Sequence, residues 1–285
     1  MIRLILVIAA LTILTLALLP FQLIAIALGL PMQRTIPHRF HRILCKLAGV
    51  RIRQNGQRAA ETPLLILANH ASWLDICVIT AVTPVVFVAK SEVAQWPVFG
   101  WLAKLQRTVF IDRERRQQTS TATAEIAGRL LGGNAVVLFA EGTSSDGTRI
   151  LPFKSALVGS VHQALGTSAV HSRIAVQPLS LAYTRIDGLP VGRALRERVA
   201  WYGDADLIPH FIGVLSSGAI DITLSWGDAV ALDIDADRKQ ITRMAEASVR
   251  RMTAAALRPT PMDSQASVAT STPALAGHGA PASNP

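Results

Sequence analysis

The chain has 285 residues, of which 50% are hydrophobic and only 16% charged, enough for one large domain or two small ones. Its formal net charge of +9 predicts an anionic partner, which is a membrane surface, a nucleic acid or a phosphorylated substrate. The only cysteines, Cys45 and Cys77, form no disulfide framework and no zinc pattern, and the histidines are scattered. The composition therefore argues against a disulfide framework and against a metal site.

The N-terminal segment is strongly apolar. Residues 4–33 contain no charged residue, and Leu4 to Leu19 is almost purely aliphatic. A helix over this span is roughly 40 Å long, enough to cross a ~30 Å hydrocarbon core with tilt. The span is too long for a cleaved signal peptide. We predict a membrane anchor over residues 1–33, and Pro20 and Gln22 leave two arrangements open, one spanning helix or a helix pair that dips into one leaflet.

A basic segment follows at residues 34–60, with seven Lys or Arg residues between positions 34 and 58 and no acidic residue there. Directly after a membrane segment, this charge predicts a chain that continues on the cytoplasmic side of the inner membrane. Each basic residue near the surface also attracts anionic headgroups by about 1 kcal/mol. Nucleic-acid binding is the weaker reading, because no aromatic residues are interleaved with the charges.

Residues 61–258 alternate short apolar runs with helical patterns. This alternation predicts a single layered α/β domain, with a mostly parallel or mixed central sheet flanked by helices. Strands are expected at Leu64–Ala68, Val85–Ala89, Thr108–Ile111, Ala135–Phe139, Ile174–Ser180, Val199–Tyr202 and Ile220–Ser225. Helices are expected at Ser72–Ala81, Ser91–Lys104, Arg115–Leu131, Lys154–Leu165, Asp204–Leu215 and Asp237–Leu257. Residues 259–285 are rich in Pro, Ala, Ser and Thr and are predicted to be a disordered tail.

The stretch after Leu64–Ala68 carries the strongest chemical signal. The strand ends in Asn69-His70, a helix is predicted from Ser72, and Asp75 falls in its first turn. One interpretation is structural, because Ser72 and Asp75 fit a capping box at a helix N-terminus. The other adds chemistry: Asp75 accepts the N–H of His70 and leaves the second ring nitrogen as a base. Backbone N–H groups at this helix start are candidate donors to an oxyanion.

Two further strands end in candidate binding residues. Arg113 follows Thr108–Ile111 and offers a planar fork for a phosphate or carboxylate, although the same stretch also suits an ordinary helix start. Glu141, Gly142 and Thr143 follow Ala135–Phe139. There Gly142 lets the backbone approach a ligand, and Glu141 and Thr143 are candidates for binding acceptor hydroxyls. The alternative is an ordinary turn, for which the following Ser-Asp-Gly is well suited.

These stretches resemble the blocks of one family. Asn69-His70-x4-Asp75 resembles the NHx4D motif of the lysophosphatidate (1-acyl-sn-glycerol-3-phosphate) acyltransferase family. Residues 110–113 are similar to its second block, in which the arginine, here Arg113, helps to bind the acceptor's phosphate. Residues 139–144 are similar to its third block, FPEGTR, with Ala140 in place of proline and Ser144 in place of arginine.

Two weaker similarities complete the series. Val176-Gln-Pro-Leu179 is similar to the fourth, proline-containing block. Lys154 matches a basic position that the family often has after its third block, which implies a contact to the donor's phosphates. Within this resemblance, Asn69 and Ser72 join Lys154 as supporting residues.

The resemblance implies a membrane-bound O-acyltransferase that moves a fatty acyl group from an acyl thioester to a lysolipid hydroxyl. The thioester is acyl-acyl-carrier protein or acyl-coenzyme A, and no other cofactor is expected. His70 would be the base and Asp75 its partner, and no G-x-S-x-G elbow is present. The expected partners are membrane lipids, the lysolipid and the acyl carrier, not nucleic acid.

The acceptor stays open at this stage. Lysophosphatidate, which gives phosphatidic acid in phospholipid biosynthesis, is the lead because it is the family's commonest substrate. Lyso-ornithine lipid, which has no phosphate, is the alternative, favoured by Ser144 and by the stretch Trp201–His210. A reading of another class is a non-catalytic membrane scaffold that keeps the fold.

Overall fold

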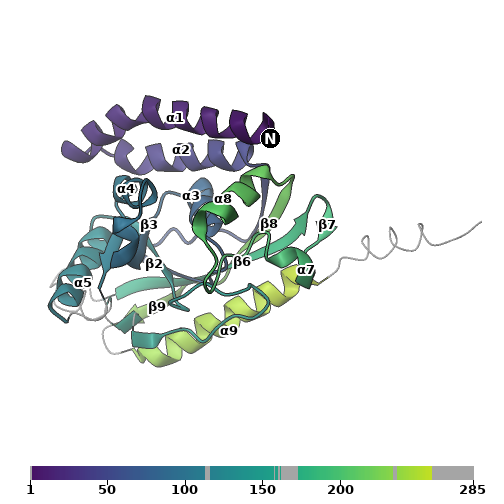
Figure 1. Cartoon of the computed structure of the whole chain (residues 1–285). Helices are drawn as coiled ribbons and strands as arrows, with labels where there is room; N and C mark the ends of the chain where they lie inside the picture. The colour runs from purple at the N-terminus through teal and green to yellow at the C-terminus, as the bar shows by residue number, and fades with distance from the viewer. Residues whose placement is uncertain are drawn as a thin grey trace, which may run out of the picture.

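The computed structural model describes residues 2–112, 116–156, 158–159, 161, 173–233 and 236–258. They form the predicted layered α/β domain around one mixed sheet, shown in Figure 1. The strands are β1 (Val50–Asn55), β2 (Leu64–Ala68), β3 (Val86–Lys90), β4 (Val109–Ile111), β5 (Ala135–Phe139), β6 (Arg173–Ile186), β7 (Leu189–Pro190), β8 (Ile220–Trp226) and β9 (Val230–Asp233). The helices are α1 (Ile2–Ala27), α2 (Met32–Leu47), α3 (Leu74–Val82), η1 (Ser91–Gln95), α4 (Phe99–Leu105), α5 (Arg116–Leu131), α7 (Arg193–Arg196), α8 (Leu207–Ser216) and α9 (Arg238–Leu257).

The sheet has the order β1-β8-β6-β2-β5-β3-β4, with β7 and β9 paired to β6. Its central strand β2 is parallel to both neighbours, β5 and β6. Leu64 and Ile66 face one core, while Leu65 and Leu67 face the other. Strands buried on both faces need continuous apolar runs, which explains why β2 and β5 have the predicted bounds.

Helices cover both faces of the sheet. In Figure 1, α2 and α3 lie over one face with α1 outside them, and α9 lies across the opposite face. The core on the α3 side includes residues of α2 and α8, and the other core includes residues of α5 and α9. The sheet is thus an inner layer, and its strand ends are held from both sides.

Strand β6 is longer than predicted and continues past Ser180 to Ile186. A proline within a strand usually marks an edge or a bulge, yet Pro178 lies in the middle of the sheet. On the side away from β2, β6 pairs with β9 up to Val176 and with β8 from Leu179. Pro178 lies between the residues of β6 that pair with β9 and those that pair with β8. Its carbonyl accepts from the Gly227 N–H, and no N–H is required of the proline there. The proline therefore marks a change of partner.

Three further sequence predictions differ from the structure, in a loop, within a helix and at the edge of the sheet. Val199–Tyr202 is not a strand, although Val199 is buried, because this segment turns back so that the Trp201 N–H donates to the carbonyl of Ala71. The helix predicted at Ser91–Lys104 is divided by Pro97 into η1 and α4. Strand β1 was not predicted, since its alternating arginines placed it in the basic segment, but it pairs in parallel with β8.

Some predictions fall partly or wholly outside the described residues. Of the helix predicted at Lys154–Leu165, residues 157, 160 and 162–165 are not described, and neither is residue 115 of the helix that precedes it. The predicted tail at 259–285 also lies outside the described residues.

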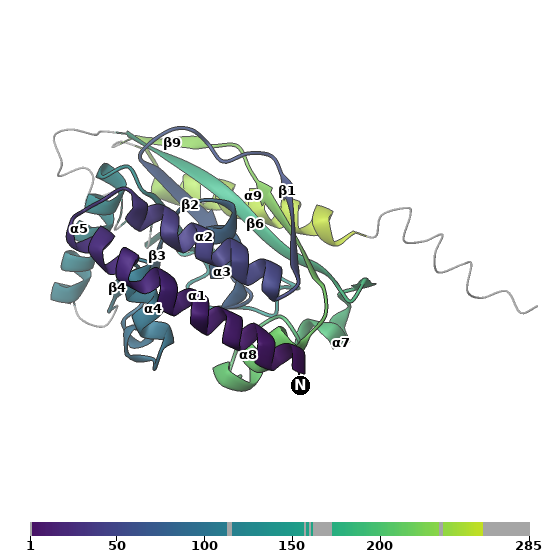
Figure 2. The same cartoon turned by 90° about the horizontal axis from the view of Figure 1, so that it is seen from above.

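Helix α1 is a single helix that runs through Pro20 and ends at Ala27. The turn comes at Gly29, whose φ of 64° suits glycine, and the Leu30 N–H closes the helix end by donating to the carbonyl of Ala25. Figures 1 and 2 show that α2 runs back alongside α1 after this turn. The two helices lie together against one side of the domain.

Polar side chains fix α1 to the domain near both ends. The buried Gln22 donates to the carbonyls of Gln33 (3.1 Å) and Leu105 (2.7 Å). At the other end, Arg3 donates to the carbonyl of Ala48 at 3.2 Å. The helix therefore lies along the domain, with direct hydrogen bonds to α2, α4 and the turn after α2.

We predict that Gln22→Leu lowers the free energy of unfolding by about 1–2 kcal/mol, because two carbonyls lose their donor. Thermal unfolding of detergent-purified protein measures this. The matched control is Thr12→Val, since the exposed Thr12 hydroxyl bonds only to Ile8 of its own helix. Equal melting temperatures for the two variants would show that Gln22 does not fix α1.

Candidate active site

The candidate site lies where β2 and β5 end side by side. Ala68 and Phe139 are register partners, and the Ala140 N–H donates to the Ala68 carbonyl at 3.1 Å. Because these strands are parallel, the residues that follow them emerge at the same edge of the sheet. This brings Asn69-His70 against Glu141, although they are far apart in the sequence.

Asn69 extends the sheet by one pair beyond the end of β2. Its side-chain amide donates to the carbonyl of Leu181 at 3.0 Å, and its carbonyl oxygen accepts from the Leu181 N–H at 2.8 Å. The side chain is almost fully buried. Asn69 thus reproduces a backbone pairing with β6 and sets the direction in which the chain enters His70.

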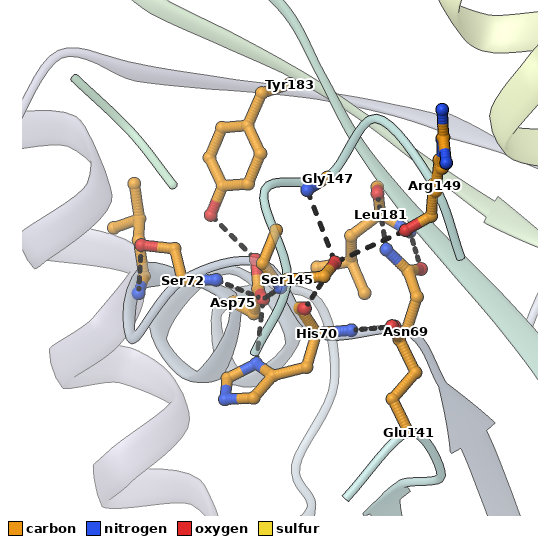
Figure 3. A network of polar contacts seen from close by, with 12 residues as sticks. Asn69, His70, Ser72, Asp75, Glu141, Ser145, Gly147, Arg149, Leu181 and Tyr183 are labelled. Carbon is orange, nitrogen blue, oxygen red and sulfur yellow. Dashed lines mark hydrogen bonds and ion pairs between the residues drawn. The ribbon is translucent and has the colours of Figure 1, made fainter. Parts of the chain in front are cut away.

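His70 and Asp75 form the expected pair. Nδ1 of His70 lies 2.9 Å from Oδ2 of Asp75, and the side chains are 16% and 0% exposed. A carboxylate on Nδ1 places the ring proton there and leaves Nε2 as the basic atom. The ring is stacked on Phe139 with 3.9 Å between centroids. In Figure 3 the Nε2 end of the ring points away from the polar network.

Asp75 is also the anchor of the turn before α3. Its Oδ2 accepts from the N–H groups of Ala71 (2.7 Å) and Ser72 (2.9 Å), and the Ser72 hydroxyl accepts from Leu74. The structural and chemical interpretations of this stretch therefore hold together, with the helix beginning at Leu74. Because Asp75 takes these two N–H groups, neither is available to an oxyanion, and the expectation of an oxyanion donor at this helix start stays a prediction for the N–H groups that follow.

Glu141 faces inward. Its two carboxylate oxygens accept from the backbone N–H groups of His70 and Leu151, both at 2.8 Å. The residue is 1% exposed, and burial raises the pKa of the carboxyl to about 7, against the lowering effect of those two N–H groups. These contacts tie the His70 turn to the loop after β5. The sequence had suggested a contact with the acceptor, which the burial of both oxygens does not favour.

The loop from Gly142 to Arg149 runs beside His70. Gly142 has a φ of 73°, which glycine adopts without strain, and Thr143 is exposed. Both the N–H and the hydroxyl of Ser145 donate to the His70 carbonyl, at 2.9 and 3.3 Å. Figure 3 shows this loop folded over the His70 backbone. Gly142 and Thr143 therefore remain candidates for contact with the acceptor.

Two predicted basic residues remain, Lys154 and Arg113. Lys154 is exposed, and its N–H donates to the Ala140 carbonyl at 2.8 Å, so it lies near the end of β5. Arg113 lies outside the described residues. Its contribution to the site stays a prediction.

Tyr183 belongs to the site and was not predicted. Its hydroxyl donates to Oδ1 of Asp75 at 2.6 Å from the middle of the sheet (Figure 3). Burial, with the added effect of the Asp75 charge, raises the pKa of Tyr183 well above its ordinary value, so the phenol stays protonated. The sequence signal was the apolar alternation beyond Ser180, which continues β6 as far as Tyr183.

Within the described part of the chain, no group of three His, Cys, Asp or Glu side chains is placed to hold a metal ion. Cys45 and Cys77 are buried, and burial raises the pKa of both thiols. Neither thiol is therefore exposed beside His70.

Several known proteins are similar to this chain in sequence or in fold. The acyltransferase family profile matches residues 49–182. A lyso-ornithine lipid O-acyltransferase of Brucella abortus is 49% identical over 256 residues, 90% of this chain and 96% of its own. A 1-acyl-sn-glycerol-3-phosphate acyltransferase of Neisseria gonorrhoeae is 40% identical over 111 residues, 38% of this chain and 44% of its own. The crystal structure of the 1-acyl-sn-glycerophosphate acyltransferase of Thermotoga maritima has the same fold, with a TM-score of 0.61 and 17% identity over 91% of this chain and 98% of its own.

We predict that Glu141→Gln lowers both stability and turnover. An amide NH2 replaces one of two buried acceptor oxygens and faces a backbone N–H, which costs about 1–3 kcal/mol. The matched control is Glu125→Gln on α5, where the exposed carboxylate pairs only with Arg129 one helical turn away. Melting temperature and specific activity are measured together. A Glu141→Gln protein as stable and active as the control would contradict the tie between Glu141 and the His70 turn.

Proposed function

The chain belongs to the acyltransferase family of lysolipid O-acyltransferases, as its sequence blocks predicted, and we propose that its acceptor is lyso-ornithine lipid. The observation that carries the proposal is the extent of the similarity. A lyso-ornithine lipid O-acyltransferase of Rhizobium meliloti is 44% identical over 86% of this chain. The similarity to the 1-acyl-sn-glycerol-3-phosphate acyltransferase of Neisseria gonorrhoeae covers only 38% of this chain. The alternative acceptor of the sequence analysis thereby becomes the favoured one.

The loop beside His70 supports this choice. Ser144 takes the place that arginine has in the family's third block, and its neighbour Ser145 contacts the His70 carbonyl. A neutral side chain so near the reacting hydroxyl suits a headgroup that carries no phosphate, since a phosphate bound there would need a cation. Lysophosphatidate remains the second candidate, because Arg113, which follows Ile111 by two residues in the sequence, is such a cation.

The geometry of His70 supports a direct acyl transfer. The acceptor hydroxyl donates its proton to Nε2 as its oxygen attacks the carbonyl carbon of the acyl thioester. Asp75 keeps Nδ1 protonated and stabilises the imidazolium that forms. When the tetrahedral intermediate collapses, the C–O bond remains, the C–S bond breaks, and His70 returns the proton to the leaving thiolate. Acyl-acyl-carrier protein and acyl-coenzyme A both supply such a thioester.

We predict that His70→Ala loses about 10²–10⁴-fold in turnover, the range of a general base. The assay supplies labelled acyl thioester with lyso-ornithine lipid or lysophosphatidate to membranes that contain equal amounts of each protein. Glu125→Gln, an exposed change on α5, is the control. Consumption of lyso-ornithine lipid that depends on His70 supports the proposal. Consumption of lysophosphatidate alone would reassign the acceptor, and turnover unchanged by His70→Ala would exclude the mechanism.

We further propose that the chain attaches to the inner membrane through α1 lying within the cytoplasmic leaflet. Among the described residues, α1 is the one helix long and apolar enough to cross a membrane. Its domain-facing residues include Val7, Leu11 and Gln22, while the opposite face exposes large apolar side chains such as Leu6, Ile13 and Leu16. A helix fixed along the domain by Gln22 and Arg3 exposes this face lengthwise, which suits a leaflet better than a span.

Neighbouring surfaces extend this apolar face. Val98 and Trp101 at α4 and Ile208 and Ile212 on α8 are exposed. Figure 2 shows α4 and α8 along the same flank of α1. The exposed Arg39 and Arg42 of α2 are candidates for contact with anionic headgroups at the rim, whereas Arg34 donates to the carbonyls of Gly132 and Gly133.

Single cysteines introduced at Ile2 and Leu28, near the two ends of α1, test this arrangement. In intact spheroplasts, an impermeant maleimide is expected to label neither position, and permeabilisation is expected to expose at least the Ile2 site. The parent protein is the control, because Cys45 and Cys77 are buried. Labelling of one end from outside the intact cell would show that α1 spans the membrane.

A further inference from the structure

Tyr183 contacts Asp75 on the side away from Nε2 of His70 (Figure 3). The phenol is 4% exposed and reaches Asp75 from the sheet, whereas His70 reaches it from the strand end. We propose that Tyr183 is a positioning residue for the reaction: it holds Oδ1 of Asp75 and so sets how His70 is oriented and how strongly it draws a proton. The inference deepens the proposed function and rests on His70 as the base.

The two carboxylate oxygens of Asp75 accept hydrogen bonds from different elements of the fold. Oδ2 accepts from His70 Nδ1 and from the N–H groups of Ala71 and Ser72, all within the turn before α3. Oδ1 accepts from Tyr183 of β6, its one hydrogen-bond donor among the side chains and backbone groups described. Because Asp75 is fully buried, water does not replace the phenol. Tyr183 therefore fixes the rotation of the carboxylate that His70 depends on.

The backbone of β6 aims the phenol at Asp75. Tyr183 pairs with Ile222 and Arg185 with Asp221, so the register shifts immediately after Tyr183. A strand irregularity of this kind redirects neighbouring side chains and increases the local twist. The Thr184 hydroxyl donates to the Asp221 carbonyl at 3.1 Å and stabilises the shifted register.

The hydrogen bond also makes Tyr183 compete with His70 for the single negative charge of Asp75. A proton shared from Tyr183 withdraws electron density from the carboxylate and leaves less of it to stabilise the imidazolium. Removing the phenol makes His70 a stronger base, and strengthening the phenol makes it a weaker one. The other titratable groups against this pair are Glu141, on the far side of the His70 backbone, and Cys77 of α3, whose burial keeps its thiol neutral.

The first test is Tyr183→Phe, which keeps the buried ring and removes only the hydroxyl. We expect the acid limb of the kcat/KM profile to move to higher pH by roughly half a unit to one unit. KM for both substrates should stay unchanged, because Tyr183 is buried and does not touch them. Tyr202→Phe, a half-exposed tyrosine, is the matched control. Glu141 titrates in both proteins, so the difference between their limbs isolates Tyr183.

The second test retains the hydroxyl and the fold. The chain contains only two tyrosines, so 3-fluorotyrosine incorporated into Tyr202→Phe protein labels Tyr183 alone. Fluorine makes the phenol a stronger donor, and the acid limb should move to lower pH, opposite to the effect of Tyr183→Phe. This arm decides the matter even where Tyr183→Phe fails to fold.

The proposal is supported if the acid limb of the kcat/KM profile moves to higher pH in Tyr183→Phe and to lower pH in the fluorinated protein. A limb that stays in place in the fluorinated protein would overturn it, even if Tyr183→Phe lowers the melting temperature, since a purely structural role alters stability without altering the pH profile. The proposed function fails separately, through turnover that survives His70→Ala.

Discussion

A single buried charge organises this molecule. The carboxylate of Asp75 has no solvent access and takes hydrogen bonds from the His70 ring, the turn before α3 and the phenol of Tyr183 in β6. An unpaired carboxylate at such a place would be strongly destabilising, so the strand end, the helix start and the sheet must all be in place together. The same set of donors leaves only one atom of the His70–Asp75 pair, Nε2, facing outward. Stability and reactivity thus depend on the same contacts.

Around this charge the sheet provides rigidity and the loops provide adaptation. Asn69 extends β2 by one backbone-like pair, and Glu141 joins the His70 turn to the loop after β5. Both are buried polar residues that bond to backbone groups, so they hold the geometry, whereas Thr143 in the loop after β5 is exposed. A family can change its acceptor by altering the loop without disturbing the base.

The sequence was most informative where the signal was local. Strands β2 and β5 have the predicted bounds because both are short apolar runs buried on two faces, and the spacing of His70 and Asp75 lies within one turn. It was least informative where a contact joins distant segments. The inward role of Glu141 depends on Leu151, and the role of Tyr183 depends on a strand that continues through a proline. Strand β1 was hidden because an edge strand tolerates arginines.

The position of α1 changes how concentration is to be understood for this protein. In the arrangement proposed above, a helix that lies along the domain and in the leaflet would keep the enzyme in the same two-dimensional layer as its lysolipid. The relevant quantity is then the number of acceptor molecules per unit of membrane area, not per unit of solution volume. Adding inert lipid at a fixed total amount of acceptor would dilute the substrate, although no bulk concentration changes. The proposed thioester donor would instead arrive from water, so the two substrates of one reaction would follow different laws of supply.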